Sequence, residues 1–271
     1  MISYSPWLIC LGLLIGAYGT LIGIGGGVIL VPALLFLYPG STPETLTAVS
    51  LAIVFLNSLS GTIAYSRQRR IDYRSGFLFA MATVPGTIIG AWAIHFLRRD
   101  LFSLIFGIML ILLSLILQLK PREKTVTASL LHKGKARTIV DASGETFVYS
   151  YNLPLGIALS FGVGFVAGLL GIGGGVILVP MMICLLFFPT HIATATSHFA
   201  LTFSALTGSL THAVAGTYTH SWQVLPYLAI GVIPGAQVGA WLSRKLQGII
   251  IIRFLALALA LMGVRLLLLA F

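Results

Sequence analysis

The sequence predicts an all-α polytopic membrane protein made of two homologous repeats, each with a glycine-rich helix break and about four to five transmembrane segments. Three observations lead to this prediction. Of the 271 residues, 58% are hydrophobic and 8% are charged, and the mean hydropathy is +1.04, which lies outside the range of water-soluble domains. Long apolar stretches follow one another along the chain. Residues 23–32, Gly-Ile-Gly-Gly-Gly-Val-Ile-Leu-Val-Pro, recur unchanged as residues 171–180.

The first repeat is expected to occupy residues 1–119. Its apolar segments are expected at 6–22, 28–38, 44–66, 76–97 and 101–119. A crossing helix needs about 20 residues and at least about 17, so 6–22 is just long enough to cross. Segment 28–38 is too short alone, and is a half-helix, a re-entrant piece or a span completed by the glycines. Thr42 is expected to cap the next helix, with Glu44 in its first turn.

Residues 120–152 form a polar stretch between the repeats, with six Lys and Arg against three acids. Two β-prone runs, 137–140 and 146–149, flank a turn-forming segment at 141–145, which predicts a small β-hairpin. Because basic loops tend to face the cytoplasm, this stretch is expected on the cytoplasmic side.

The second repeat is expected at residues 153–271 and follows the order of the first. Its apolar segments are expected at 153–170, 176–188, 191–215, 222–242 and 249–271. The two copies stay in register, since Ser50 matches Ser197 and Gly61 matches Gly208. Such an internal duplication is common in membrane transporters.

The distribution of basic residues favours inverted repeats. The third segment of the first half is followed by four arginines in the loop around Arg70, whereas its counterpart in the second half has none. If basic loops face the cytoplasm, each half crosses the membrane an odd number of times. Tags placed after Arg70 and after Tyr218 are then expected on opposite sides of the membrane.

The duplicated glycine stretch is the first candidate site. Glycines at this density break a membrane helix, and the freed backbone groups then need cover from protein or a watery cavity. Each stretch also leads into a helix N-terminus, which carries unsatisfied N–H donors and suits an anion. The alternative is that the glycines only allow close helix packing. The candidate residues are Gly23, Gly25, Gly26, Gly27, Gly171, Gly173, Gly174 and Gly175.

A polar stripe on the long helix of each half is the second candidate. Ser50 and Asn57 lie two helical turns apart, and Ser197 and Ser204 occupy the matching positions. Such a neutral lining suits a small oxyanion, although the same side chains could serve helix-to-helix hydrogen bonds. Gln237 replaces an isoleucine within a motif that the halves share, and could donate to the substrate or bridge two helices.

His198 is the candidate for carrying a coupling proton, because a titratable side chain within a membrane span is functional by default. His212 is a weaker candidate, and both could instead serve a membrane-embedded enzyme or a metal site. None of the six acids lies in the middle of a span, which disfavours a pump for metal cations. Common hydrolase, redox and phosphate-loop motifs are absent from the sequence, so no cofactor, no protein-bound metal and no catalytic residue are expected.

The duplicated stretch and a Pro-Gly-x-x-x-Gly-Ala motif in each half, at 85–91 and 234–240, resemble the TauE/SafE family of sulfite exporters and sulfonate permeases. The resemblance covers both repeats and leaves 120–152 uncovered. It implies that the glycine stretches line a central site, with Ser50, Asn57, Ser197 and Ser204 facing it. It also implies a small sulfur-containing anion as the substrate.

These observations predict a secondary transporter of sulfite, a sulfonate or a similar anion, in a bacterial inner membrane, with alternating access at the interface of the repeats. A membrane potential that is negative inside favours export of an anion. A permease for another small anion or a cation is an alternative. The net charge of +10 reflects membrane topology and not nucleic-acid binding. The expected partners are the substrate, the lipid bilayer and a possible second copy of the chain.

Overall fold

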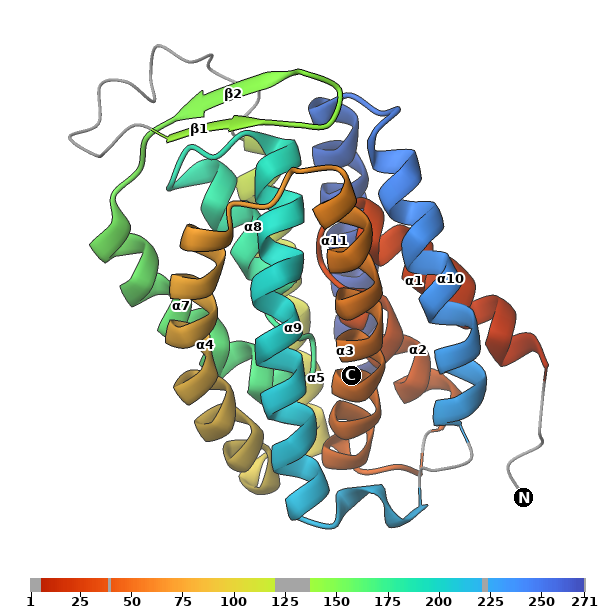
Figure 1. The fold of residues 1–271 in the computed structure, drawn as a ribbon. Coiled ribbons are helices and arrows are strands. Elements are labelled where there is room, and N and C mark those ends of the chain that lie inside the picture. Colours follow the sequence, from red (N-terminus) through yellow and green to blue (C-terminus); the bar gives the residue numbers. More distant parts are fainter. Residues whose placement is uncertain (1–5, 39, 120–136, 221–223, 271) are drawn as a thin grey trace.

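The computed structural model describes residues 6–38, 40–119, 137–220 and 224–270, and within these ranges the chain is almost entirely helical (Figure 1). The first half contains α1 (Trp7–Leu21), α2 (Gly27–Leu37), α3 (Pro43–Arg67), α4 (Tyr73–Ala93), the short 3-10 helix η1 (Ile94–Phe96) and α5 (Arg99–Leu119). The second half contains α7 (Leu153–Leu170), α8 (Gly175–Cys184), α9 (Thr190–Val214), η2 (Thr217–His220), α10 (Leu225–Ser243) and α11 (Gly248–Ala270).

Five of these helices are long and apolar enough to cross a membrane, among the residues that the structure describes. They are α3, α4 with η1, α7, α10 and α11. The predicted class, an all-α polytopic membrane protein, is therefore confirmed. Residues 6–22, expected to cross, instead give the 15-residue helix α1, which is shorter than the roughly 17 residues that a crossing needs.

Local side-chain caps explain where several helices begin. The Thr42 side chain accepts a hydrogen bond from the Thr45 amide at 3.3 Å, and Pro43 follows in the first helical turn. The Asn152 side chain accepts from the Leu155 amide at the start of α7. Such caps satisfy amide groups that have no partner inside the helix. The predicted cap at Thr42 is confirmed.

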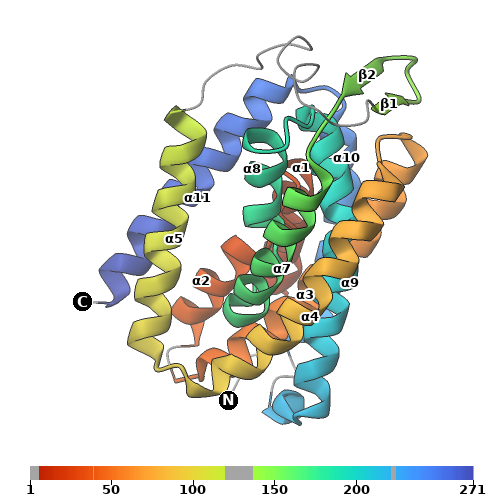
Figure 2. The same ribbon diagram turned by 90° about the vertical axis from the view of Figure 1, so that its left-hand side faces the viewer.

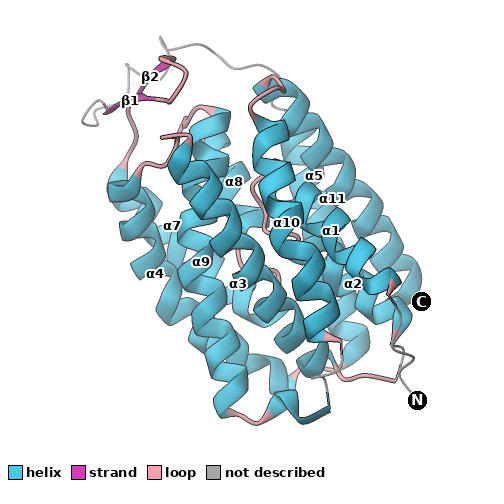
Figure 3. Cartoon of the chain, turned by 45° about the vertical axis from the view of Figure 1, so that its right-hand side comes forward, coloured by secondary structure: helices cyan, strands magenta, loops and turns pink. Residues whose placement is uncertain are grey.

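The two halves interlock through four helix pairs, and α3 and α9 form the pair at the centre (Figure 3). Helix α1 packs along α10, α4 along α7, and α5 along α11, which lie side by side on one flank (Figure 2). In all four pairs one helix comes from each half. Most of the buried core therefore belongs to both halves at once.

The helix directions follow from which residues meet. Gly61 of α3 lies against His198 of α9, whereas Gly208 of α9 lies against Leu51 of α3, so these helices are antiparallel. In α5 and α11, the Ser114 side chain donates to the Ala256 carbonyl, and Gly107 lies against Gly263. This pair is antiparallel as well. In these two pairs the corresponding helices of the two halves thus run in opposite directions, which is the arrangement that inverted repeats predict.

Helices α1 and α2 form a hairpin that turns back at the first glycine stretch. The end of α1 lies beside the C-terminal part of α3, where the Tyr65 hydroxyl donates to the Thr20 carbonyl. Helix α2 then returns to the end where α3 begins (Figure 1). Helices α7 and α8 form the matching hairpin from the opposite end of the molecule (Figure 2). Of the three expected forms of segment 28–38, the structure shows the re-entrant piece.

The Pro-Gly-x-x-x-Gly-Ala motifs hold the halves together. A Cβ atom on Gly86 or Gly90 of α4 would overlap backbone atoms of α7, and one on Gly235 or Gly239 of α10 would overlap backbone atoms of α1. These small residues let the backbones approach closely, as at other helix interfaces in membranes. The motif is therefore a packing device between the halves.

The predicted β-hairpin is present. Strands β1 (Arg137–Val140) and β2 (Thr146–Tyr149) pair antiparallel, with Arg137 opposite Tyr149. The hairpin lies at one end of the helical bundle, where the Ala142 amide donates to the Gln68 carbonyl just after α3 (Figure 1). The first part of the polar stretch, residues 120–136, lies outside the described residues.

Candidate substrate site at the paired glycine breaks

The two glycine stretches adopt the same unusual backbone. Gly23, Gly25 and Gly26 have φ values of 82°, 75° and 83°, and the corresponding glycines of the second half have 71°, 73° and 92°. This left-handed region is costly for any residue with a Cβ atom. The repeated spacing of glycines is therefore required by the turn itself.

Both stretches end at a helix whose first amide groups are unpaired. The first hydrogen bonds of α2 run from Ile29 and Leu30 to the Gly26 carbonyl, and those of α8 run from Ile177 and Leu178 to the Gly174 carbonyl. Within the described part of the chain, the amide groups just before these donors have no hydrogen-bond partner; they are those of Gly27, Val28, Gly175 and Val176. Together with the helix dipole, they give each break a partial positive charge.

The two breaks meet at the centre of the molecule. A Cβ atom on Gly27 would lie 2.8 Å from Ile172 Cα, and one on Gly175 would lie 2.8 Å from Ile24 Cα. The residues of both stretches are buried, and the apolar side chains around them form the main hydrophobic core. Two positively polarised helix ends from opposite halves are thus enclosed together, in a closed conformation.

Ser50 and Ser197 brace the two breaks in the same way. The Ser50 hydroxyl donates to the Gly171 carbonyl at 2.7 Å, and the Ser197 hydroxyl donates to the Gly23 carbonyl at 2.9 Å. Each serine therefore satisfies a carbonyl that the broken helix of the other half leaves free. In this conformation both hydroxyls bind backbone, and their part in substrate binding stays a prediction.

Asn57 belongs to a polar cluster that the sequence analysis found only in part. The Thr20 hydroxyl donates to Asn57 Oδ1 at 3.0 Å and lies 3.2 Å from His198 Nε2. The Tyr65 ring packs edge-on against the His198 ring at 5.6 Å. These four side chains come from α1, α3 and α9 and are buried. They surround the point where α1 ends and the first break begins.

Two atoms of this cluster have no partner. Asn57 Nδ2 and His198 Nδ1 are buried and make no hydrogen bond within the described residues. Leaving a buried donor or acceptor unpaired costs about 1–3 kcal/mol, and such groups in native structures are uncommon and call for a reason. A ligand or a proton that reached this cluster would find a free amide donor and a free ring nitrogen.

Ser204 and Gln237 lie in helix contacts. Ser204 hydrogen bonds to the Thr87 hydroxyl of α4 at 2.8 Å. Gln237 Nε2 donates to the carbonyl and hydroxyl oxygens of Ser60 at 2.8 and 2.9 Å, which joins α10 to α3. Of the two roles considered for Gln237, this conformation shows the bridge between helices.

His198 and His212 lie in separate surroundings. His212 is buried near His95, with ring centroids 6.4 Å apart. Among the described residues, no group of three or more His, Cys, Asp or Glu side chains is placed to hold a metal ion. Cys10 is exposed and Cys184 is buried.

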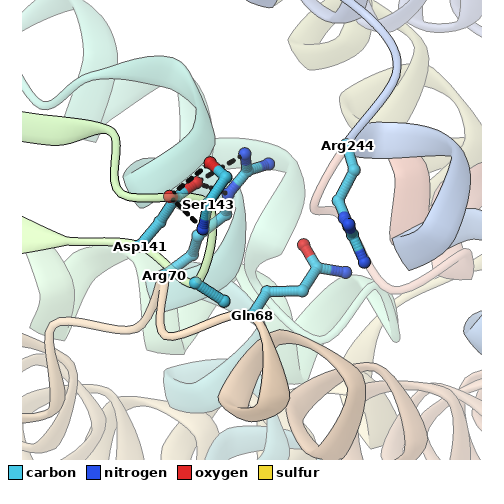
Figure 4. Close-up of a pocket in the computed structure, with 6 residues that line it drawn as sticks. Gln68, Arg70, Asp141, Ser143 and Arg244 are labelled. Atoms are coloured by element: carbon cyan, nitrogen blue, oxygen red, sulfur yellow. Dashed lines mark hydrogen bonds and ion pairs between the residues drawn. The ribbon is translucent and has the colours of Figure 1, made fainter.

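A small polar pocket beneath the β-hairpin was not anticipated. It has a volume of about 110 Å³ and is lined by Gln68, Arg70, Asp141, Ala142, Ser143 and Arg244 (Figure 4). Arg70 donates to Asp141 Oδ2 through Nε at 3.0 Å and through Nη2 at 2.8 Å. Both side chains are at most 7% exposed. This buried ion pair joins the hairpin to the loop between α3 and α4.

Hydrogen bonds keep Asp141 charged at this position. Burial alone would raise the pKa of Asp141, but bonds from the Ser143 hydroxyl, Arg70 and two backbone amides lower it to about 2. A carboxylate with a lowered pKa stabilises the fold above its ordinary pKa, and this contribution is lost only as the pH falls toward 2. The hairpin therefore stays docked across the physiological range.

A helical bundle of two interlocked halves, with paired re-entrant breaks that enclose a polarised centre, is the architecture of a multi-pass membrane transporter. The family comparison agrees with this class. The chain belongs to the sulfite exporter TauE/SafE family, whose model matches residues 8–266.

The relatives are also described as transporters. The probable membrane transporter protein YunE of Bacillus subtilis is 39% identical over 265 residues, which cover 96% of each chain. A probable membrane transporter protein of Haemophilus influenzae is 30% identical over 89% of this chain and 86% of its own. One from Methanocaldococcus jannaschii is 25% identical over 89% and 87%, respectively. No solved structure matches the chain.

Proposed function

We propose that the protein is a secondary transporter of a small sulfur-containing anion, such as sulfite or a sulfonate. The observation that carries the proposal is the pair of helix N-termini that meet at the centre with unpaired amide groups at Gly27, Val28, Gly175 and Val176. Such ends attract a negative charge, and in a membrane the unpaired donors favour any ligand that can accept from them. The family description supports a sulfur oxyanion.

Transport would require the two breaks to separate. In the closed conformation a Cβ atom on Gly25 or on Gly173 would overlap Leu201 and Val54, so apolar side chains fill the space beside both breaks. Movement of one half against the other would open a path to them from one side of the membrane at a time. Ser50 and Ser197 would then exchange a backbone carbonyl for the substrate, and Asn57 would supply its free amide donor.

Export is the direction that the membrane potential favours. Moving one negative charge outward gains about 2.3 kcal/mol per 100 mV when the inside is negative. Uptake against that field would need a proton, for which His198, with its unpaired Nδ1, is the proposed carrier. We also propose that the protein resides in a bacterial inner membrane with the hairpin on the cytoplasmic side, because the loop there is basic.

The test is anion efflux from proteoliposomes that hold purified protein. Gly25→Leu and Gly173→Leu place a bulky side chain against Leu201 and Val54 and are expected to reduce sulfite efflux to background. Gly162→Leu is the matched control, because a Cβ atom there meets no atom within 4 Å. Asn57→Leu removes one free donor without backbone strain and should weaken substrate binding.

Two results would contradict the proposal. One is unimpaired efflux in both the Gly25 and the Gly173 variants when their thermal unfolding matches that of the parent protein. The other is a flux of cations that sulfite, sulfonates and other anions do not compete with. Efflux rates measured for sulfite, a simple sulfonate, sulfate and chloride in the same proteoliposomes would rank these anions as substrates.

A further inference from the structure

A second cluster of titratable side chains lies at the end of the molecule opposite the hairpin. Glu44, at the start of α3, lies 3.1 Å from His95 Nδ1 through its Oε2 atom. Its Oε1 atom accepts a hydrogen bond from the Thr217 hydroxyl at 2.8 Å. Glu44 therefore joins η1, from the first half, to η2, from the second half.

His212 completes this cluster from below the surface. It is fully buried near the end of α9, with its ring 6.4 Å from that of His95, and neither of its ring nitrogens has a hydrogen-bond partner within the described residues. His95 and Glu44 are about a third exposed. The cluster thus leads from solvent-accessible groups to a buried, unpaired imidazole.

The matching positions at the hairpin end carry different chemistry. In the register that aligns Ser50 with Ser197, Glu44 corresponds to His191 and Thr217 corresponds to Arg70. There the contact is between Arg70 and His191, at 3.5 Å, and the charge of Arg70 is neutralised by Asp141. An arginine with a carboxylate keeps both charges between pH 5 and 8, whereas a histidine with a carboxylate does not.

We propose that Glu44 and His95, which lie over the buried His212, form a proton-binding site, and that binding of the proton closes this end of the protein. With a proton on its ring, His95 forms an ion pair with Glu44, and this pair holds η1 against the start of α3. Without that proton the ion pair is lost, and only the bond from Thr217 to Glu44 holds this end. Its purpose rests on the proposed transport function, but the site itself is defined by the contacts alone.

Few other charges act on this site. Arg98 and Asp100, which follow η1, pair with each other at 3.7 Å and are mostly exposed. Among the described side chains, Glu44 makes no ion pair with a lysine or an arginine. The charge of His95 therefore decides whether Glu44 has a cationic partner.

The test uses a reporter thiol just inside this end. Thr47, one turn after Glu44 on α3, is fully buried and lies 2.8 Å from where a Cβ atom of Gly171 would stand. With Cys10 and Cys184 changed to Ser, the Thr47→Cys protein in nanodiscs is labelled with a charged methanethiosulfonate at pH 5.5 and pH 8. The reference is the same reporter protein with the added change Glu44→Gln, labelled at the same two pH values. At each pH, the labelling rate of the reporter protein is divided by that of the reference. This ratio cancels the effect of pH on the thiol itself.

The expected ratio at pH 5.5 is about fivefold lower than at pH 8, the size of effect that a partly exposed ion pair gives. His95→Gln should make the ratio the same at both pH values, whereas Asp141→Asn, at the hairpin end, should leave the difference intact. A pH-independent ratio in the reporter protein would overturn the proposal. Absence of sulfite flux with the pH difference retained would instead refute the transport function and leave the proton site standing.

Discussion

The two glycine breaks share one geometry but differ in their polar surroundings. Each has three glycines in the left-handed region, each starts a helix with unpaired amides, and each has a carbonyl braced by a serine from the opposite half. Ser50 on Gly171 and Ser197 on Gly23 are the same contact made twice. The duplication has therefore kept the backbone that the break requires.

The neighbours of the first break are more polar than those of the second. Beside the first break lie Thr20, Asn57 and His198. In the register of the repeats their counterparts are Gly168, Ser204 and Leu51. A Cβ atom on Gly208 would lie 2.9 Å from Leu51, in the place where Gly61 meets His198. We infer that the features common to both breaks bind the anion. We also infer that the side chains found only beside the first break, above all His198, carry a proton.

The largest expected effect concerns the direction of the two halves. A cysteine or an epitope tag after Arg70 and one after Tyr218 should report opposite sides of the membrane, because the antiparallel pairs α3 with α9 and α5 with α11 place these loops at opposite ends (Figure 1). The measurement is labelling of intact and permeabilised cells with an impermeant reagent. Both tags on one side would mean that the halves are not inverted in the membrane.

The second prediction concerns His198, in the polar cluster beside the first break. His198→Leu gives the first break the residue that its counterpart carries, and should abolish sulfite uptake driven by a proton gradient while efflux driven by the potential persists. The measurement is sulfite uptake and efflux in proteoliposomes with an imposed pH gradient or potential.

The matched control is Leu51→Met, a swap of similar volume that should cost less than about 1.5 kcal/mol and leave uptake intact. Uptake that survives in the His198 variant would remove this side chain from proton transfer.

The third prediction tests the glycines at the two helix interfaces, α4 with α7 and α1 with α10, which should behave alike. Gly90→Ala and Gly239→Ala would each force a methyl group into the backbone of the partner helix, at a cost of about 1–3 kcal/mol. Gly162→Ala, with open space around it, should be neutral or slightly stabilising because alanine favours the helix. Thermal unfolding in detergent measures all three, and a large difference between Gly90 and Gly239 would show that the two interfaces are not equivalent.

Local patterns made much of the fold predictable. The hairpin strands and helix α7 have the bounds that the sequence indicated, because turn residues and a capping asparagine act over a few positions. Segment 6–22 differed, since its length fits a span but the glycines that follow turn the chain back. Hydropathy measures only how apolar a segment is, and it does not report the direction of the backbone after a break.

The site was less predictable, because its contacts join distant parts of the chain. The carbonyls that Ser50 and Ser197 bind lie 121 and 174 residues away in sequence, so no local pattern could identify them. Thr20 was missed, although it is the one threonine or serine in the apolar segment before the first break, which is a usable signal. The ion pair of Arg70 with Asp141 depends on how the hairpin docks and had no signal at all.

The smallest expected effect concerns the two serine braces, and it bears most directly on whether the breaks are equivalent. Ser50→Ala and Ser197→Ala each remove one hydrogen bond to a buried carbonyl, which should lower the free energy of unfolding by about 0.5–1.5 kcal/mol. The Ser197 hydroxyl also lies 2.9 Å from the carbonyl of Thr194 within its own helix, so it shares its proton between two acceptors and its loss should cost less than that of Ser50. Chemical denaturation of the purified protein measures the difference. A greater loss in the free energy of unfolding for Ser197→Ala than for Ser50→Ala would contradict this prediction. It would mean that Ser197 stabilises more than the Gly23 carbonyl, and the adjacent cluster around His198 would be the additional part.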